Sequence, residues 1–137
     1  MGTRLAGLYT VNGTETNSVE AMEQLRQWNK ASDLGIDAQL STDSIRIEVP
    51  GNHFVQCTLS FYGEADVTYY AEIRVNGLTL GLVSTQEVTV ASKPFNMTVI
   101  GAGTVDIGDL VSVYIGSDEA GGANFRLLYG QFGVMSL

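Results

Sequence analysis

Residues 106–137 read DIGDLVSVYIGSDEAGGANFRLLYGQFGVMSL and decide the fold class. A Gly108–Asp109 turn precedes an expected strand over Leu110–Ile115, which has the alternating pattern of a β-strand. An acidic, glycine-rich loop follows, and the chain ends on an aromatic and aliphatic strand over Phe125–Leu137. Period-two patterns joined by polar turns predict antiparallel β-structure.

The same alternation continues upstream. Apolar and polar residues alternate over Ile45–Val49 and His53–Phe61, on either side of a Pro50–Gly51 turn. Tyr69–Val75 repeats the pattern and ends at Asn76–Gly77, the strongest short hairpin signal. We expect further strands at Leu78–Val83, Gln86–Ala91 and Asn96–Ile100. About eight to ten antiparallel strands with polar turns predict an all-β jelly-roll sandwich.

The first 40 residues give a weaker pattern. We expect a first strand over Leu5–Val11, and a loop with a short extended piece over Asn29–Thr42. A short helix capped by Asn17 or Ser18 is predicted between them. Its apolar residues recur at intervals of three: Val19, Met22, Leu25 and Trp28. Residues 1–40 would thus form an N-terminal strand or arm, and residues 43–137 the body, of one domain over 1–137.

Composition narrows the class of protein. The 137 residues suit a single domain, and 45% are apolar while 16% are charged, as in globular proteins. A net charge of -8 with scattered basic residues argues against nucleic-acid binding. The lone Cys57 excludes an internal disulfide framework. No apolar run resembles a secretion signal or a membrane span, so we expect folding in the cytoplasm and no membrane partner.

Three segments together resemble the globular domains of the tumour necrosis factor and complement superfamily. The first is Asp43–Phe61, where Gly51 matches but His53 stands in place of a usual Tyr, and Cys57 in place of a frequent aromatic. The second is the strand that ends at Asn76–Gly77, and the third is the C-terminal segment with Gly108–Asp109. The resemblance implies a jelly roll that acts by binding as a homotrimer and is not an enzyme.

In such trimers the terminal strand lies at the three-fold axis. Leu128, Phe132 and Val134 would serve one face of it, and Tyr129, Gln131 and Met135 the other, while glycines would let a neighbour approach. The alternative is that one chain covers both faces itself. The resemblance implies these interface residues: His53, Leu128, Tyr129, Gln131, Phe132, Gly133, Val134 and Met135.

Compact forms of this jelly roll resemble the trimeric accessory proteins of bacteriophage particles. We therefore expect a virion protein made in the host cytoplasm, a capsid decoration or cement protein that stabilises the head. Its partner would be the major capsid protein or another virion protein, reached through Arg4, Leu5, Leu8 and Tyr9. The alternative is a receptor- or glycan-binding head of a phage fibre, or a secreted trimeric ligand, with Tyr62, Tyr69 and Tyr70 at its ligand loop.

Candidate chemistry is sparse. His53 and Cys57 lie four residues apart, about 13 Å along one strand, too far to form a nucleophile and base pair. Three copies of His53 at a three-fold axis could bind a metal or sense pH; the alternative is a structural histidine. Asp118 and Glu119, with Asp106 and Asp109 nearby in sequence, are weak calcium ligands or simply solvated acids. We expect no catalytic residue and no cofactor.

Overall fold

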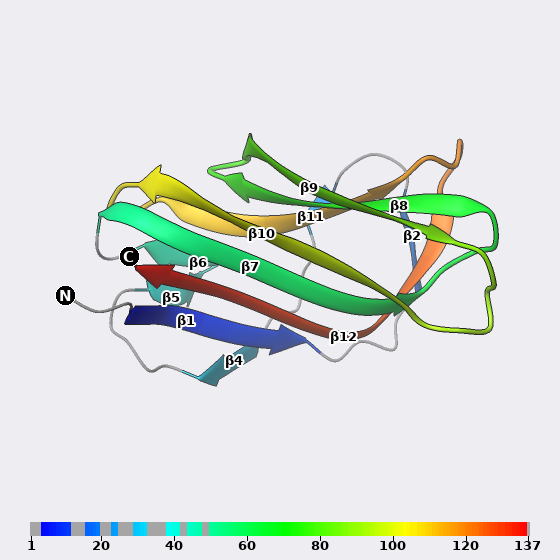
Figure 1. Ribbon diagram of the computed structural model, residues 1–137, viewed down its shortest axis with the longest axis horizontal. Coiled ribbons are helices and arrows are strands. Elements are labelled where there is room, and N and C mark those ends of the chain that lie inside the picture. Colours follow the sequence, from blue (N-terminus) through cyan, green and yellow to red (C-terminus); the bar gives the residue numbers. More distant parts are fainter. Residues whose placement is uncertain are drawn as a thin grey trace.

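All regular secondary structure lies in strands over the residues that the structure describes: 4–11, 16–19, 23–24, 29–32, 38–41, 44–47 and 50–136. This is a computed structural model, and it places side chains over 44–47, 50–79 and 81–135. The strands form two antiparallel sheets that lie face to face and run along the long axis of the molecule (Figure 1). The predicted all-β jelly-roll sandwich is confirmed.

Sheet A has the strand order β10-β7-β12-β1-β4, with β2 paired to the start of β12. Its long central pair, β7 and β12, is hydrogen-bonded from Tyr62 opposite Arg126 to His53 opposite Ser136. β1 lies beside β12, so the beginning and the end of the chain are neighbours. The strands are β10 (Phe95–Val105), β7 (Gly51–Tyr62), β12 (Ala123–Ser136), β1 (Arg4–Val11), β4 (Asn29–Ser32) and β2 (Thr16–Val19).

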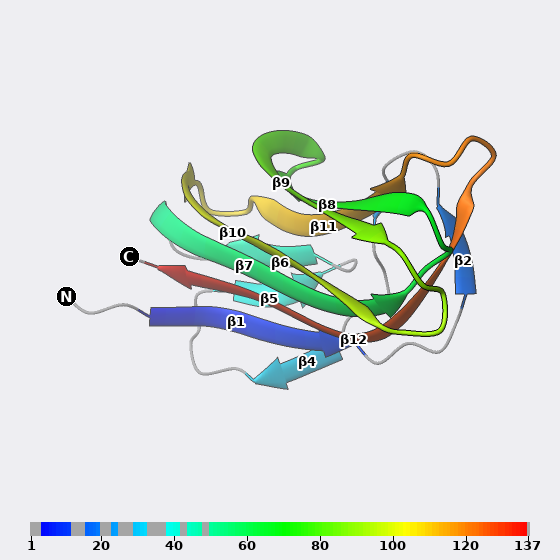
Figure 2. The same ribbon diagram turned by 45° about the vertical axis from the view of Figure 1, so that its right-hand side comes forward.

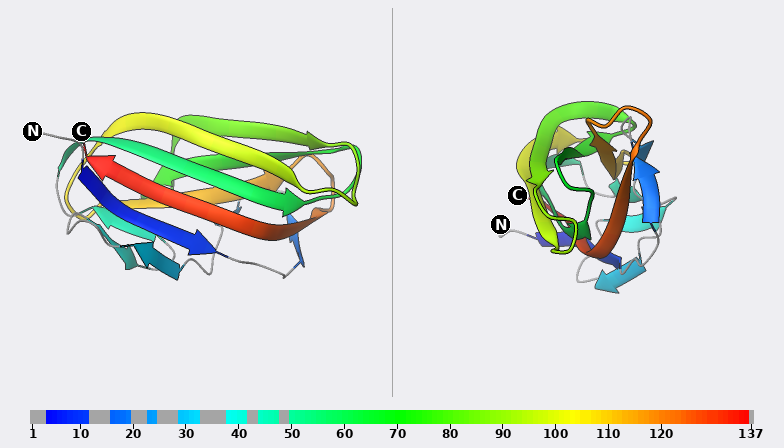
Figure 3. Two further views of the ribbon diagram at one scale, coloured as in Figure 1. Left: turned by 60° about the horizontal axis from the view of Figure 1, so that its bottom comes forward. Right: turned by 90° about the vertical axis from the view of Figure 1, so that its right-hand side faces the viewer.

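Sheet B has the strand order β5-β6-β11-β8-β9, with β3 paired to β11. The end-on view shows how the two sheets enclose a common interior (Figure 3). The strands are β5 (Ala38–Ser41), β6 (Ser44–Ile47), β11 (Leu110–Ser117), β8 (Val67–Val75), β9 (Leu78–Val88) and β3 (Glu23–Gln24).

The N-terminal region differs from the prediction. Residues of the predicted helix lie in strands instead: β2, Thr16–Val19, pairs with the start of β12 in sheet A (Figure 2), and β3, Glu23–Gln24, pairs with β11 of sheet B. The chain therefore crosses here from one sheet to the other. Backbone pairing with the sheets outweighs the period-three pattern. Met22, Leu25 and Trp28 lie outside the described residues.

Two further predictions need correction. The region 29–42, expected to be mostly loop, contains β4 and β5. The strands expected at Leu78–Val83 and Gln86–Ala91 are joined in one strand, β9, which ends at Val88, so that Ala91 lies in the loop after it. Gly81 has a φ of 77°, and the register against β8 shifts nearby, between Ile73 and Arg74. The irregularity bends the strand without ending it.

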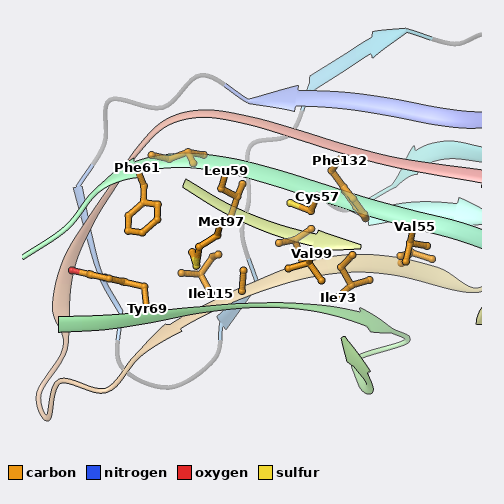
Figure 4. Close-up of a cluster of buried hydrophobic side chains, with 14 of the residues drawn as sticks. Val55, Cys57, Leu59, Phe61, Tyr69, Ile73, Met97, Val99, Ile115 and Phe132 are labelled. Carbon is orange, nitrogen blue, oxygen red and sulfur yellow. The ribbon is translucent and has the colours of Figure 1, made fainter. Parts of the chain in front are cut away.

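The core lies between the inward faces of the two sheets. Along β7 every second side chain from His53 to Phe61 is buried, which confirms the predicted alternation. Figure 4 shows these side chains meeting those of β8, β10 and β11 between the layers. Phe61 stacks on Phe125, with ring centroids 5.1 Å apart, and meets the edge of Tyr69 at 5.2 Å. Full burial of one such side chain contributes about 1.5–3 kcal/mol, so this face stabilises the sandwich without another chain.

Candidate interaction surface

The outer face of sheet A lacks charge over its three longest strands. β7 and β10 contain no Asp, Glu, Lys or Arg, and β12 contains only Arg126. The whole chain carries 22 such residues among 137. The solvated face of an antiparallel sheet is normally polar, and exposed edges are usually protected by charges. This face therefore has the composition of a contact surface.

One half of this face is apolar. Ala102, Phe54 and Met135 stand side by side across β10, β7 and β12. Phe54 and Met135 are half-buried, and Ala102 is exposed. In the adjacent row Ile100, whose side chain is 58% exposed, stands opposite the polar Gln56. An apolar patch on the sheet face, with no charge inside it, is favourable to cover.

The other half carries hydroxyl and amide groups that bond to one another. Ser60 Oγ donates to Asn96 Oδ1 at 2.5 Å across β7 and β10. The hydroxyls of Thr58 and Thr98 lie 3.5 Å apart in the next row. On β12 the amide of Gln131 donates to the hydroxyl of Tyr129. Because these groups already have partners in the same chain, this half loses little hydrogen bonding when another surface covers it.

A bulge in β12 changes which residues face outward. The register shifts between Leu127 and Tyr129, so that Leu127 is buried while Leu128 is 41% and Tyr129 38% exposed. Leu128 was expected to share a face with Phe132; this is wrong, because the bulge turns it outward. Gln131 and Met135 are outward and half-buried, in line with the face predicted for them.

Three of the expected interface residues lie in the interior instead. Phe132 is 1% exposed, Val134 0% and His53 1%. Their own chain already encloses them, as Figure 4 shows for Phe132. They cannot form a surface on which another chain packs, so the prediction for these side chains is corrected. Gly133 is buried too, opposite Gln56 on β7.

Beside this face, β10 and β9 form an apolar edge. β10 is the edge of sheet A and β9 the edge of sheet B. They approach closely, because a Cβ on Gly101 of β10 would lie 2.6 Å from Leu82 Cδ2 of β9. Val83 on β9 is 48% exposed, and Ile100 on β10 belongs to both the edge and the face. The face and the edge adjoin along β10.

The histidine and the cysteine are interior residues. Nδ1–H of His53 donates to the Gly51 carbonyl at 3.0 Å, and its Nε2 has no hydrogen-bond partner in the part of the chain that the structure describes. Cys57 is fully buried, and burial raises the pKa of its thiol far above the usual range. A buried neutral thiol is a poor nucleophile.

The three candidate ligand tyrosines differ in their surroundings. Tyr69 is fully buried: its hydroxyl donates to the Asn124 carbonyl at 2.5 Å and accepts from the Glu64 backbone N–H at 2.9 Å. Burial raises the pKa of this phenol. Tyr62 lies on β7 under the guanidinium of Arg126, which is 5.0 Å from the ring centroid, and Tyr70 lies on β8 of the other sheet. The expectation that Tyr69 is available to a ligand is therefore wrong, while the ligand role of Tyr62 and Tyr70, which are half-buried on either side of the β7–β8 loop, stays a prediction.

The acidic residues serve turns. Asp118 Oδ1 accepts from the Thr68 N–H at 3.0 Å, and the Asp118 N–H donates to the Thr68 carbonyl at 3.0 Å, which holds the β11–β12 loop to β8. Asp109 lies at the opposite end of β11 from Asp118 and Glu119, so the acids that are near in sequence do not gather. Among the described residues, no three His, Cys, Asp or Glu side chains are grouped to hold a metal ion.

Sequence reasoning missed a connection between two turns. Asn76 Nδ2 donates to Asp109 Oδ1 at 3.0 Å, and the Leu110 N–H donates to Asn76 Oδ1 at 3.0 Å. Asp109 Oδ2 also accepts from the Asp106 N–H at 2.9 Å. Both partners lie in turns that the sequence indicated, Asn76–Gly77 and Gly108–Asp109. What it could not indicate is that the turns meet.

The four residues expected to reach a capsid partner lie in β1. The backbone of Leu5 pairs with Met135, and that of Leu8 with both Gly133 and Ser32. Arg4 and Tyr9 pair with Ser136 and Phe132. β1 is thus an integral strand of sheet A between β12 and β4, and not a free arm.

Solved structures share this architecture across nearly the whole chain. The globular domain of zebrafish complement 1qA superposes with a TM-score of 0.70 at 18% identity, over 96% of this chain and 97% of that one. Eiger TNF from S. frugiperda gives 0.67 at 16% identity, over 98% and 93%. Murine APRIL at pH 5.0 gives 0.60 at 14% identity, over 93% and 98%.

The fold is the jelly roll of these domains. No protein-family model and no curated protein matches the sequence. The likeness therefore establishes the fold alone. Over the described residues, the chain contains no helix with the length and hydropathy to cross a bilayer.

Proposed function

We propose that the protein acts without catalysis as a homotrimer, in which the outer face of sheet A in each chain receives the β9–β10 edge of the next. The observation that carries this proposal is the nearly charge-free face built by β7, β10 and β12. The face and the edge are different patches of one chain. Such a head-to-tail contact closes into a ring when the rotation between neighbours is a simple fraction of a turn.

Charge also favours this arrangement. Each chain carries a net charge of -8, so copies repel one another wherever charged surfaces meet. The uncharged face brings no carboxylate into the contact, and the edge brings one at most, Glu87 near the end of β9, so the desolvation cost of an ionic interface stays small. Ile100, Met135 and Phe54 supply apolar surface at one end of it, while the internally bonded hydroxyls and amides occupy the other. The acidic remainder then keeps the trimers apart in solution.

We propose further that this trimer is a bacteriophage head decoration protein, bound in the virion to the major capsid protein or another virion protein. Leu78, 73% exposed, is the first residue of β9, ahead of the Leu82–Val83 part of the edge, and Ile107, 63% exposed, lies in the turn after β10. They flank the two turns that Asn76 and Asp109 tie together, so they belong to a pre-ordered end of the sandwich. Three such ends on one trimer could bridge neighbouring capsid subunits, and weak contacts made together add strongly.

Co-sedimentation with heads of the encoding phage, stripped of decoration, tests this role. The proposal predicts that the trimer pellets with heads and raises the temperature at which they open. Leu78→Ser with Ile107→Ser should abolish pelleting while the mass in solution stays unchanged. Val90→Ser, at an exposed loop position 41% accessible at the other end, is the matched control and should pellet normally. Failure of the wild type to pellet contradicts the decoration role and leaves self-association to its own test.

A second candidate is a receptor- or glycan-binding head. The opposite end of the sandwich presents exposed acids, Asp66 before β8 and Glu119 after β11. An acidic tip suits a basic protein ligand. A soluble trimer that ignores heads but binds host cells, with binding weakened by Asp66→Asn and Glu119→Gln, would favour this function over decoration.

A further inference from the structure

The turn between β8 and β9 has a chemically sensitive sequence. Asn76 and Gly77 are both exposed and both have positive φ, 53° and 78°. An asparagine followed by glycine is the pair most open to attack on its side-chain amide, because glycine has no Cβ to shield its backbone nitrogen. An exposed Asn–Gly pair is therefore slowly deamidated unless the fold restrains the asparagine side chain.

We propose that Asn76 is a deamidation site that the fold holds closed through Asp109 and Leu110. In the reaction the Gly77 nitrogen gives up its proton and attacks Cγ of Asn76. The new N–Cγ bond forms as the Cγ–Nδ2 bond breaks, and Nδ2 takes up a proton and leaves as ammonia. Water then opens the resulting five-membered imide at either carbonyl, which yields aspartate or isoaspartate.

Three hydrogen bonds oppose the first step. Asn76 Nδ2 donates to Asp109 Oδ1 at 3.0 Å, and Asn76 Oδ1 accepts from the Leu110 N–H at 3.0 Å. The Asn76 N–H donates to the Leu110 carbonyl at 2.8 Å. Both ends of the side-chain amide are thus fixed, one to Asp109 and the other to Leu110 at the start of β11, and Cγ must leave both partners to reach Gly77. The reaction rate should follow the fraction of time for which this contact is open.

The product would keep the contact open. Aspartate at position 76 has no amide to donate to Asp109, and it places a second carboxylate beside the first. Like charges at hydrogen-bond distance repel, so the two turns separate. Isoaspartate adds a backbone atom to a tight turn as well. Deamidation therefore releases the connection that had restrained it.

Peptide mapping by mass spectrometry after incubation in mildly alkaline buffer measures the conversion. We expect the native protein to deamidate at Asn76 at least about tenfold more slowly than the urea-unfolded chain, because opening must break three hydrogen bonds. The second Asn–Gly pair of the chain, Asn12–Gly13, calibrates the unfolded rate. Equal native and unfolded rates at Asn76 would overturn the proposal.

A matched pair of variants separates local release from general destabilisation. Asp109→Ala should raise the native rate at Asn76 about tenfold, since it removes one of the bonds and loosens the turn. Asp118→Ala removes a carboxylate that accepts a backbone N–H at the other end of β11, and should leave the Asn76 rate unchanged. Equal rates in wild type and Asp109→Ala, or equal acceleration by both variants, would overturn the assignment.

A measurement on the wild type needs no variant. In urea below the unfolding transition, deamidation at Asn76 should rise in parallel with hydrogen exchange at the Leu110 amide, because one opening exposes both. If exchange at Leu110 accelerates while deamidation does not, the bonds to β11 do not control the reaction.

Discussion

The side-chain amide of Asn76 donates a 3.0 Å hydrogen bond to the carboxylate of Asp109, 33 residues further along the chain. The bond joins the β8–β9 turn to the turn between β10 and β11. Asp109 also accepts from the Asp106 N–H, and its own carbonyl accepts from the Ile47 N–H at 2.9 Å. Asp109 therefore connects the β8–β9 turn, the β10–β11 turn and the end of β6 at one end of the sandwich, which explains why an aspartate follows Gly108.

Replacing Asp109 should destabilise the fold. Asp109→Ala removes the acceptor of the Asn76 amide and of the Asp106 N–H, two exposed donors that water can then reach, and we expect a loss of about 0.5–1.5 kcal/mol in the free energy of unfolding. Urea denaturation followed by far-UV circular dichroism measures it. The exposed neighbour Asp106 is the control, and Asp106→Ala should change stability by less than about 0.5 kcal/mol. Equal effects at the two positions would show that the carboxylate of Asp109 has no special role.

Gly63 should not tolerate a side chain. A Cβ there would lie 2.5 Å from Tyr69 Cε2 and 2.8 Å from Cζ, and the ring is held between Phe61 and Phe125. Gly63→Ala should cost about 1–3 kcal/mol, because a packed ring cannot move aside. Gly101→Ala is the control: its Cβ would meet the methyl ends of Leu82, which can rotate. Thermal unfolding should show the larger loss at Gly63, and the reverse order would contradict this packing.

Tyr69 should make stability sensitive to alkali. Its pKa is raised by burial, so above the ordinary tyrosine pKa of about 10 the unfolded chain ionises before the folded one. The contribution is complete below pH 10 and is lost as the pH rises toward the folded pKa. Tyr69→Phe should remove this dependence of stability on alkaline pH. At neutral pH it should lower the free energy of unfolding by about 1–3 kcal/mol, because the Glu64 N–H and the Asn124 carbonyl lose their hydrogen-bond partner. Unfolding curves across alkaline pH test this, and an unchanged slope in the variant would refute it.

Glu72 should make stability sensitive to acid. Burial alone would raise the pKa of this carboxyl, but hydrogen bonds from Thr79 and Arg74 and the charge of Arg74 lower it below the usual value. The stabilisation is therefore complete above the unfolded pKa of about 4.3 and is lost as the pH falls through the folded value. Glu72→Gln should flatten this acid loss, whereas Glu87→Gln, at an exposed position, should not. Unfolding free energies measured for both variants at a series of pH values from about 2 to about 6 test this difference.

Much of the fold could be predicted from the sequence, because alternation reports which face of a strand is buried. The inward row of β7 and the Asn76–Gly77 hairpin were correct for that reason. Tyr69 alternates in step with Ala71 and Ile73 and so lies on the same face of its strand; the pattern therefore indicated that Tyr69 is buried. The prediction for Leu128 was wrong because a bulge reverses which residues of a strand face inward, and no particular residue type in the sequence marks a bulge. The β2–β3 segment was missed because pairing partners far along the chain, and not local period, decide its conformation.

A charge introduced at the proposed trimer interface should prevent the chains from associating. Ile100→Asp places a carboxylate on the β10 row shared by the face and the edge, where the side chain is 58% exposed and folding should tolerate it. Burying this charge against a neighbour would cost several kcal/mol, enough to dissociate the trimer. Val90→Asp, at a loop position 41% exposed, should leave the assembly intact. Sedimentation velocity compares the two, and an Ile100→Asp protein that stays trimeric would place the interface elsewhere.

The most direct measurement is the mass of the purified wild-type protein in solution by multi-angle light scattering, over a range of concentrations. Self-association through sheet A predicts three times the 14.7 kDa of one chain. A mass of one chain at all concentrations would contradict the central claim, and the uncharged face would then need another partner to cover it.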